Sequence, residues 1–414
     1  MAAASTKEPT AFGISPKTAK AVADPWRLRI LAEVGAKPLS PSQFVEQFGG
    51  ELTHVARCFR QLAKWGYIEV AEERHGRRLG AAVEHVYRAM RRAHFDASAW
   101  EDISLGLRDS ASRSTLSAYQ QRVKAALQSG TFDLEPDRHL SWDAIALDGT
   151  AWVELGERLD EILASVMAHE AMRAGRSQKV DDEAIPTIVG LAAFRSPEAP
   201  SSLLKGAYRQ LPRHPNELDG IDPIGPELAK ALSNRWRCQI ISEVGIRPLS
   251  PSQFVEEVGG SMTHISRCFR DLAEWGFLEV FEERNGGRRG GGVERIYRST
   301  RRPYFDAPTW EALPQVVRAG ISQFVLTTYF ARVSEALEAG TFDAEIDRHL
   351  SWTQVVIDRA AWRETGGALD DVLVWLPELE SQSLERTEDV EDLIPTTVGL
   401  AAFRAAPKSQ TFAD

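Results

Sequence analysis

The sequence lacks the features that mark several classes of protein. Its 414 residues include only three cysteines, Cys58, Cys238 and Cys268, and none of them forms a CxxC pair. This argues against a disulfide framework or a zinc ribbon and fits a reducing compartment. No apolar run approaches the roughly 20 residues that a membrane-spanning helix needs, and the N-terminus has no apolar signal segment. We therefore expect a cytoplasmic protein with no membrane partner.

Positive charge is also scarce. The 49 Lys and Arg residues are outnumbered by 59 Asp and Glu residues, which gives a net charge of -10. A uniform nucleic-acid-binding surface would have the opposite sign, so any contact with DNA has to come from local basic patches. No phosphate-binding loop of the GxxxxGK[ST] or GxGxxG type follows an expected strand, so we expect no cofactor.

What the chain does contain is a long internal repeat. The stretch PLSPSQFVEQFGGELTHVARCFRQLAKW at residues 38–65 returns as PLSPSQFVEEVGGSMTHISRCFRDLAEW at 248–275, an offset of 210 residues. A later segment at 129–148 returns at 339–358, and IPTIVGLAAFR at 185–195 returns as IPTTVGLAAFR at 394–404. A period this long indicates two fused copies of a whole domain pair, not a solenoid.

The repeat and the proline- and glycine-rich segment between its copies predict the domain boundaries. We expect a disordered lead at 1–14, a first head at 15–95, a first accessory segment at 96–195, a linker at 196–226, a second head at 227–305, a second accessory segment at 306–405 and a tail at 406–414.

Within the first head, the positions of capping residues, prolines and glycines predict short helices joined by a tight turn. Asp24 and Ser40 precede prolines at expected helix starts, and Gly49-Gly50 separates a helix at 41–48 from one at 51–64. The buried stripe expected on that last helix is Leu52, Val55, Phe59 and Leu62. Alternating residues at 67–74 and 83–88 predict a hairpin around a tip at 75–80.

The first accessory segment predicts a second α+β unit. Residues 97–129 and 150–173 have helical periodicity, and residues 139–147 and 185–194 have the composition of strands. Whether these strands pair within one copy or between the two copies is left open by the sequence.

Taken together, ADPWRLRILAEV, SPSQFVEQFGG, THVARCFRQLAKWGYIEV and the arginine-containing hairpin resemble the winged helix-turn-helix regulators of the ArsR-like group. The resemblance covers residues 19–89 and, more loosely, 229–299. It implies two fused winged helix-turn-helix domains. Together with the helix and strand patterns that follow each of them, this predicts an α+β, mainly helical fold in which each winged helix-turn-helix domain is followed by an α+β accessory segment. The resemblance also implies a bacterial transcription regulator that works as a dimer. The segments after Phe95 and Phe305 do not match metal-sensing members, whose paired-cysteine motif is absent.

The helix at 51–64 presents a polar face opposite its apolar stripe. Gln61 lies on that face with hydroxyl and cationic side chains that suit a DNA major groove. We expect Arg57 to contact a base, and Arg60 and Lys64 to contact phosphates. The candidate DNA-binding residues, hairpin arginines included, are Thr53, His54, Arg57, Arg60, Lys64, Arg74, Arg77 and Arg78 in the first copy and Thr263, His264, Arg267, Arg270, Arg284, Arg288 and Arg289 in the second.

The two copies differ on this face. Asp271 and Glu274 stand in the second copy where Gln61 and Lys64 stand in the first. Fewer cations release fewer counterions, so we expect the second copy to bind DNA more weakly or to bind a different half-site.

Two groupings of residues resemble a catalytic triad and a metal site, but their spacing in the sequence favours neither. Asp137, His139 and Ser141 have the residue types of a nucleophilic triad, but alternate positions on one strand are not expected to give its geometry. His54 and Cys58, four residues apart, offer two metal ligands, which are too few for a site within one copy. We therefore predict no catalytic residues and no metal. Trp100/Trp310, Trp142/Trp352 and Trp152/Trp362 are interpreted as core or interface anchors, with an effector pocket as the alternative.

The sequence thus predicts a non-enzymatic, DNA-binding transcription regulator whose two heads form a covalent pseudo-dimer on an imperfect palindrome. The expected partners are double-stranded DNA and either the other copy within the chain or a second chain. Two alternatives stay open: a protein-interaction scaffold that does not bind DNA, which the acidic net charge favours, and a regulator whose accessory segments bind a small-molecule effector.

Overall fold

The computed structural model describes residues 24–36, 38–74, 83–89, 104–175, 184–201, 234–285, 293–300, 307–345 and 347–407. The predicted lead at 1–14, the linker beyond residue 201 and both hairpin tips lie outside these ranges. The chain is α+β with more helix than strand. It divides into two compact units: the described residues up to Ala125 with 351–355 and 405–407 form one, and those within 126–350 and 356–404 form the other. No helix among the described residues is long and apolar enough to cross a membrane.

We call the first three helices and first hairpin the first head. It consists of α2 (Pro25–Ala36), α3 (Pro41–Phe48), α4 (Leu52–Lys64), β1 (Ile68–Arg74) and β2 (Glu84–Ala89). The predicted helix starts are confirmed, because Asp24 accepts a hydrogen bond from the Arg27 amide at 3.0 Å and Ser40 forms a capping box with Gln43. These caps fix where α2 and α3 begin.

The turn between α3 and α4 depends on glycine. Gly49 and Gly50 have φ angles of 76° and 101°, a region that other residues rarely adopt. A Cβ atom added at Gly50 would lie 2.5 Å from the Trp26 ring. The turn therefore needs glycine both for its backbone conformation and for the close approach of α2.

The core of the first head corrects one predicted position. Val55, Phe59 and Leu62 are buried as expected, but Leu52 is 48% exposed and Cys58 completes the buried stripe in its place. Leu52 is the first residue of α4 and is exposed to solvent there, whereas Cys58 lies on the inner side of the helix. Behind α4, Leu39 and Tyr87 exchange two backbone hydrogen bonds of 2.9 Å, which tie the hairpin to the start of α3.

The second head repeats this arrangement with α10 (Arg235–Ile246), α11 (Pro251–Val258), α12 (Met262–Glu274), β5 (Leu278–Asn285) and β6 (Val293–Ser299). Leu249 and Tyr297 exchange the matching backbone bonds at 3.0 and 2.9 Å. Both hairpins are antiparallel and shift register directly after the equivalent residues Val70 and Val280. The weaker sequence match of the second copy therefore does not change its local structure.

The accessory segments supply the longer elements. Those of the first copy are α6 (Leu105–Gln128), β3 (His139–Leu147), α7 (Gly149–Gly175) and β4 (Ile185–Arg195). Those of the second are α13 (Ala307–Ala312), α14 (Gln315–Ala339), β7 (His349–Ile357), α15 (Arg359–Arg386), the 3-10 turn η2 (Val390–Asp392) and β8 (Ile394–Arg404). The predicted helix at 97–129 is described only from Leu105 onward.

The accessory strands pair between the copies. Their order in the sheet is β3-β8-β4-β7, so strands of the first and second copies alternate. In the central antiparallel pair, Leu191 lies opposite Leu400, and these are equivalent residues of the two copies. Thr187 lies opposite Arg404. Their equivalents in the other copy, Thr396 and Arg195, also lie opposite each other. The sheet therefore has an internal pseudo-two-fold relation at Leu191 and Leu400.

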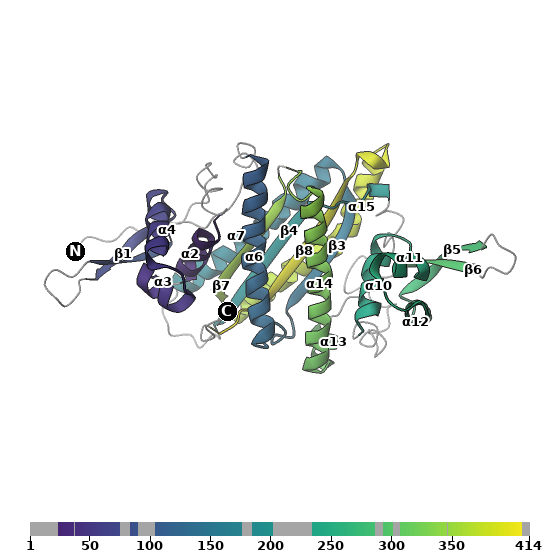
Figure 1. Cartoon of the computed structure of the whole chain (residues 1–414), viewed down its shortest axis with the longest axis horizontal. Coiled ribbons are helices and arrows are strands. Elements are labelled where there is room, and N and C mark those ends of the chain that lie inside the picture. Colours follow the sequence, from purple (N-terminus) through teal and green to yellow (C-terminus); the bar gives the residue numbers. More distant parts are fainter. Residues whose placement is uncertain are drawn as a thin grey trace. The chain divides into compact units, whose positions relative to one another are not determined.

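Helices cover the two faces of this sheet (Figure 1). On one face, the indole of Trp142 on β3 donates to Thr328 on α14 at 3.3 Å. On the other face, His139 contacts Asp370 on α15 at 2.8 Å, and its equivalent His349 lies 3.2 Å from Asp160 on α7. Odd-numbered and even-numbered positions of β3, represented by His139 and Trp142, thus face different helices, as the pleat of a strand requires.

Buried indole groups join the two copies reciprocally. Trp152 donates to Asp347 at 2.6 Å, and its equivalent Trp362 donates to Asp137 at 2.8 Å. Both indole side chains are almost fully buried. These two tryptophans are therefore interface anchors, one of the two roles that the sequence left open for them.

Candidate nucleic-acid interface

The exposed face of α4 carries the residues singled out in the sequence. Thr53, Arg57, Arg60 and Lys64 are all exposed. At 3.6 residues per turn they lie within an arc of about 60°, opposite the buried stripe. The face therefore carries one hydroxyl group and three positive charges, all within about four turns of helix, and no acidic side chain among the described residues pairs with these charges.

The second head presents an equivalent face on α12. Thr263, His264, Arg267 and Arg270 are exposed, as is Glu274 at the position of Lys64. Arg270 donates to the backbone carbonyl of Ser266 at 3.3 Å, one turn earlier on the same helix. The hydroxyl and both arginines of the first face are thus kept, and only the last cation is replaced by an acid.

Gln61 and Asp271 do not belong to these faces, which corrects the sequence interpretation. Gln61 accepts a hydrogen bond of 3.0 Å from Arg27 on α2, and Asp271 pairs with Arg237 on α10 at 2.7 Å. Because Arg237 neutralises Asp271, the charge difference between the two faces reduces to Lys64 against Glu274. The apolar pattern predicts Gln61 on the polar face because it lies outside the buried stripe, and Asp271 is its equivalent in the second copy.

His54 lies at the edge of the first face and turns partly inward. Its ring packs edge-on against Trp26 with centroids 6.2 Å apart, and its Nε2 atom lies 3.6 Å from Cys58 Sγ. His54 is half-buried, whereas His264 is exposed. The two histidines therefore differ in their access to a ligand on the outer face.

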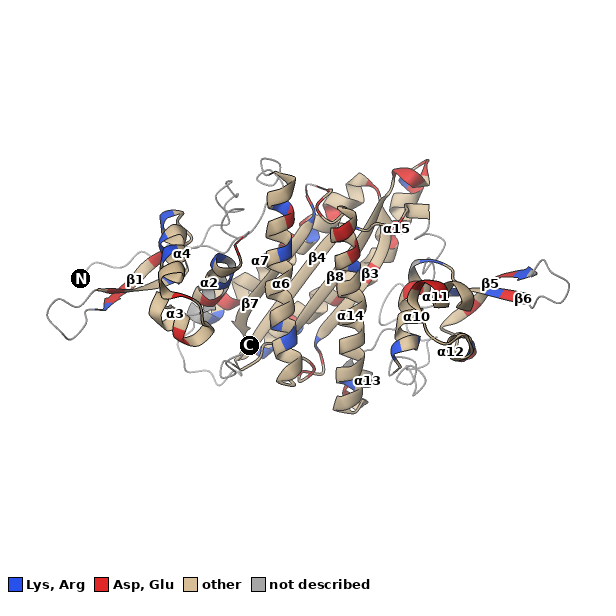
Figure 2. Ribbon diagram, viewed as in Figure 1, with Lys and Arg blue, Asp and Glu red and all other residues tan. Residues whose placement is uncertain are grey.

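The described hairpin arginines are already paired. Arg74 makes two hydrogen bonds of 3.0 Å to Glu72, and Arg284 makes bonds of 2.9 and 3.0 Å to Glu282. These bonds raise the pKa of both guanidinium groups and lower the pKa of both carboxyls. Figure 2 shows the resulting mixture of acidic and basic residues along β5 and β6. The partners are exposed side chains, and such pairs are weak enough to exchange.

The remaining hairpin candidates, Arg77, Arg78, Arg288 and Arg289, lie outside the described residues. Sequence reasoning missed Arg88 and Arg298, which point outward from β2 and β6 and pair with Glu69 and Glu279. Their position one residue after a buried tyrosine in each hairpin could have revealed them, because neighbouring strand residues face opposite sides.

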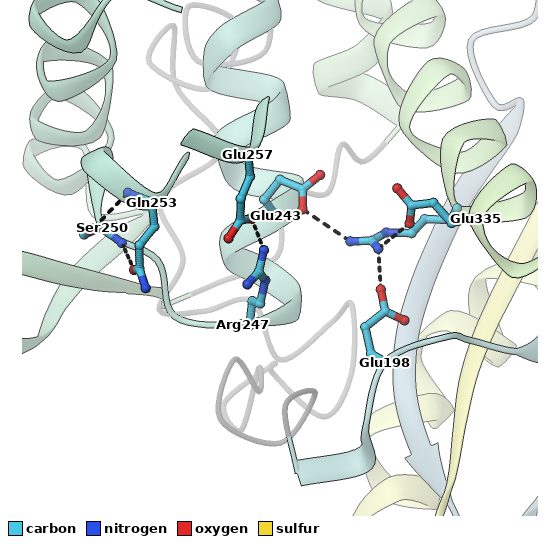
Figure 3. Close-up of polar contacts among 8 residues, drawn as sticks. Glu198, Glu243, Arg247, Ser250, Gln253, Glu257 and Glu335 are labelled. Atoms are coloured by element: carbon cyan, nitrogen blue, oxygen red, sulfur yellow. Dashed lines mark hydrogen bonds and ion pairs between the residues drawn. The ribbon is translucent and has the colours of Figure 1, made fainter. Parts of the chain in front are cut away.

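A buried ion network anchors the second head to its accessory helix. Arg332 on α14 contacts Glu243 on α10 at 3.4 Å and Glu335 at 2.8 Å, and it also pairs with Glu198 after β4. Figure 3 shows the three carboxylates turned toward one guanidinium. Burial raises the pKa of Glu243, and the charge of Arg332 opposes that rise. The equivalent pair in the first copy is Arg122 on α6 with Glu33 on α2. The network therefore fixes α10 on α14.

The residues considered for a nucleophilic triad form a different chain of hydrogen bonds. His139 Nε2 lies 2.7 Å from Ser141 Oγ, and His139 Nδ1 lies 2.8 Å from Asp370 of the second copy. The expectation that alternate strand positions cannot bring a histidine to a serine is therefore wrong. Asp137 is not part of this chain, because it accepts the Trp362 indole instead. The observed bonds fix α15 on β3.

Comparison with protein-family models, with curated proteins and with solved structures finds no match for this chain. Its function has to be inferred from the residues and geometry described above.

Proposed function

We propose that the chain is a DNA-binding transcription regulator in which each head acts as a winged helix-turn-helix. The observation that carries this proposal is the exposed Thr-Arg-Arg stripe that recurs on α4 and α12. In each head the stripe lies on the helix that follows a Gly-Gly turn and precedes a two-stranded hairpin. A helix of 13 residues is about 20 Å long, a length that a major groove accepts.

The roles of the residues follow from their places on the helix. Arg57 and Arg267 lie in the middle of the exposed face, where a guanidinium can form two bonds to a guanine edge. Arg60, Lys64 and Arg270 lie toward the C-terminal half, where they suit phosphate contacts. The hairpin arginines add phosphate contacts once they exchange their glutamate partners for DNA.

The interleaved sheet supports a covalent pseudo-dimer. Its pseudo-two-fold register at Leu191 and Leu400 joins the accessory segments of the two copies within one chain. Dimeric regulators place two reading helices on two half-sites of a palindrome. Here we propose that one chain supplies both helices, and that Glu274 makes the two half-sites unequal.

The test is binding of the full chain to a pool of random-sequence 30-base-pair duplexes, followed by sequencing of the retained DNA. We expect an imperfect palindrome. Arg57→Ala should weaken binding to the selected duplex by about 1–3 kcal/mol, a factor of roughly 5 to 150, and relax one base position. Arg158→Ala is the control, since Arg158 is an exposed cation on α7 that pairs with Glu161.

Salt separates this function from a scaffold. Contacts to about 6–10 phosphates should make the affinity fall by about three to five orders of magnitude between 50 and 200 mM salt. Absence of DNA retention at low salt would refute the proposal and favour a protein-interaction module. Equal binding by Arg57→Ala and the wild-type protein would refute the choice of reading face.

A further inference from the structure

Three groups that can bind a metal meet between α2 and α4 in the first head. A carboxylate oxygen of Asp24, a ring nitrogen of His54 and the Cys58 sulfur all lie within 4.8 Å of one another. His54 and Cys58 are neighbours because residues four apart share one side of a helix. Asp24 joins them because α2 packs on α4. From the sequence alone only His54 and Cys58 are expected as ligands, because Asp24 is remote from both along the chain.

We propose that Asp24, His54 and Cys58 bind one divalent transition-metal ion of the zinc class. Thiolate, imidazole and carboxylate are all zinc ligands, and bond lengths of about 2.0–2.3 Å place the ligand atoms of a tetrahedral site about 3.3–3.8 Å apart. The Cys58 Sγ to His54 Nε2 distance is already 3.6 Å. Three protein ligands leave one position for water or an external ligand.

Cys58 is buried, so its sulfur becomes a ligand when a bound cation takes the place of the thiol proton, which is released to solvent. A coordinated dication stabilises the thiolate far more than a neighbouring guanidinium does. Asp24 and His54 are half-buried, so an ion reaches the buried sulfur from their side of the site.

The existing contacts of Asp24 leave it able to act as a ligand. Its Oδ1 atom caps α2 by accepting the Arg27 amide, and its Oδ2 atom lies 3.6 Å from the Arg27 guanidinium. That guanidinium is also held by Gln61 at 3.0 Å and lies over the Trp65 ring at 5.2 Å. Oδ2 can therefore turn to a metal while Arg27 keeps two of its other contacts.

The second head contains a natural comparison. His264 and Cys268 keep the same geometry at 3.7 Å, but Asn234 replaces the aspartate. Asn234 still caps α10 by accepting the Trp236 amide at 2.9 Å. The second head therefore has the helix cap without the anionic third ligand, and we infer one site per chain.

The experiment is a titration of the reduced full chain with Co²⁺, read by sulfur-to-cobalt charge-transfer absorption and by equilibrium dialysis. The wild-type protein should bind one ion with a thiolate ligand. Cys58→Ser should abolish the charge-transfer band, and Asp24→Asn should weaken binding at least about tenfold, since even outer-shell changes cost 10–100-fold. Asn234→Asp should raise the stoichiometry to two ions per chain.

The controls separate ligand loss from damage to the fold. Asp24→Asn preserves the helix cap, because asparagine caps as well as aspartate does. Cys268→Ser and Cys238→Ala should leave the band and the stoichiometry unchanged. Absence of the band from the wild-type protein, its persistence in Cys58→Ser, or its loss in Cys268→Ser would overturn the proposal. No DNA is present in the titration, so the result is independent of the proposed DNA binding.

Discussion

Replacing Arg332 with methionine tests the ion network that holds α10 on α14. Arg332 is 9% exposed and faces Glu198, Glu243 and Glu335, whose side chains are 17%, 21% and 49% exposed. Methionine fills much of the same volume but leaves these carboxylates without their shared cation. Removing one partner of a fully buried ion pair costs about 3–5 kcal/mol. Because water reaches part of each carboxylate, we expect a loss of about 2–3 kcal/mol at pH 8.

The loss should depend on pH with a definite sign. Burial already raises the pKa of Glu243 in the folded protein, and Arg332 opposes that rise. Without Arg332 the pKa rises further above the unfolded value of about 4.3. A carboxyl with a raised folded pKa destabilises the fold at high pH, and this effect fades as the pH falls through the folded pKa toward the unfolded one. The difference between variant and wild type should therefore be smaller at pH 5 than at pH 8.

Urea unfolding followed by circular dichroism at both pH values measures this difference. Arg332→Met combined with Glu243→Gln should recover part of the loss, because one of the largely buried carboxylates that lost its cation is now uncharged. The matched control is Arg122→Met on α6, the equivalent position in the first copy. Arg122 is 27% exposed and its ion pair is with Glu33, so its loss should be about 1 kcal/mol. Equal losses for Arg332→Met and Arg122→Met, or a loss for Arg332→Met that does not change with pH, would refute the reasoning.

Two further predictions concern the sheet. Cleavage of the chain within residues 202–233 should leave the two halves associated in gel filtration, because strands of the two copies alternate in the sheet; separation of the halves without denaturant would contradict the interleaved order. Gly399→Ala should lower the free energy of unfolding by about 1–3 kcal/mol, because its Cβ would lie 2.4 Å from the Tyr329 ring. Gly367→Ala, a helical position with open space around it, should cause no loss, and equal stability of the two variants would contradict the assigned packing.

The local elements of the heads could be predicted from the sequence because their signals are local. Ser40 with Pro41 marks a helix start, Gly49-Gly50 marks a turn, and the structure shows a capping box and two positive φ angles at these places. The prediction that Leu52 is buried is wrong because the apolar pattern is also a local signal. A periodic pattern says which side of a helix is apolar, but it does not say how far the covering elements extend past the helix end.

The partners of side chains at the edge of a face depend on packing that the pattern does not contain. Gln61 lies near the exposed stripe on the helical wheel, yet Arg27 from another helix binds it. The sequence predicts Asp24 as a helix cap, but its approach to His54 and Cys58 depends on how α2 packs on α4. Each of these contacts joins residues about 30 positions apart, which no local rule reaches.

The strand pairing was beyond prediction for a reason that the duplication itself creates. Because β4 and β8 have nearly the same sequence, pairing within a copy and pairing between copies satisfy the same apolar pattern. The observed pairing fixes Leu191 opposite Leu400 and brings His139 to Asp370 and Trp362 to Asp137 across the copies. These polar contacts are reciprocal, so they add stability only when both copies are present and folded together.

Fusion of the two copies also allows them to differ. In a homodimer of identical chains, any change on the helix equivalent to α4 appears in both heads. Here Lys64 faces solvent in one head and Glu274 in the other, and Asp24 is matched by Asn234. Strands of both accessory segments share one sheet, so neither head has to keep the partner surface that a separate subunit would need. The duplicated chain can therefore keep a shared sheet while one head alone carries Lys64 on its exposed face and an aspartate beside its histidine and cysteine.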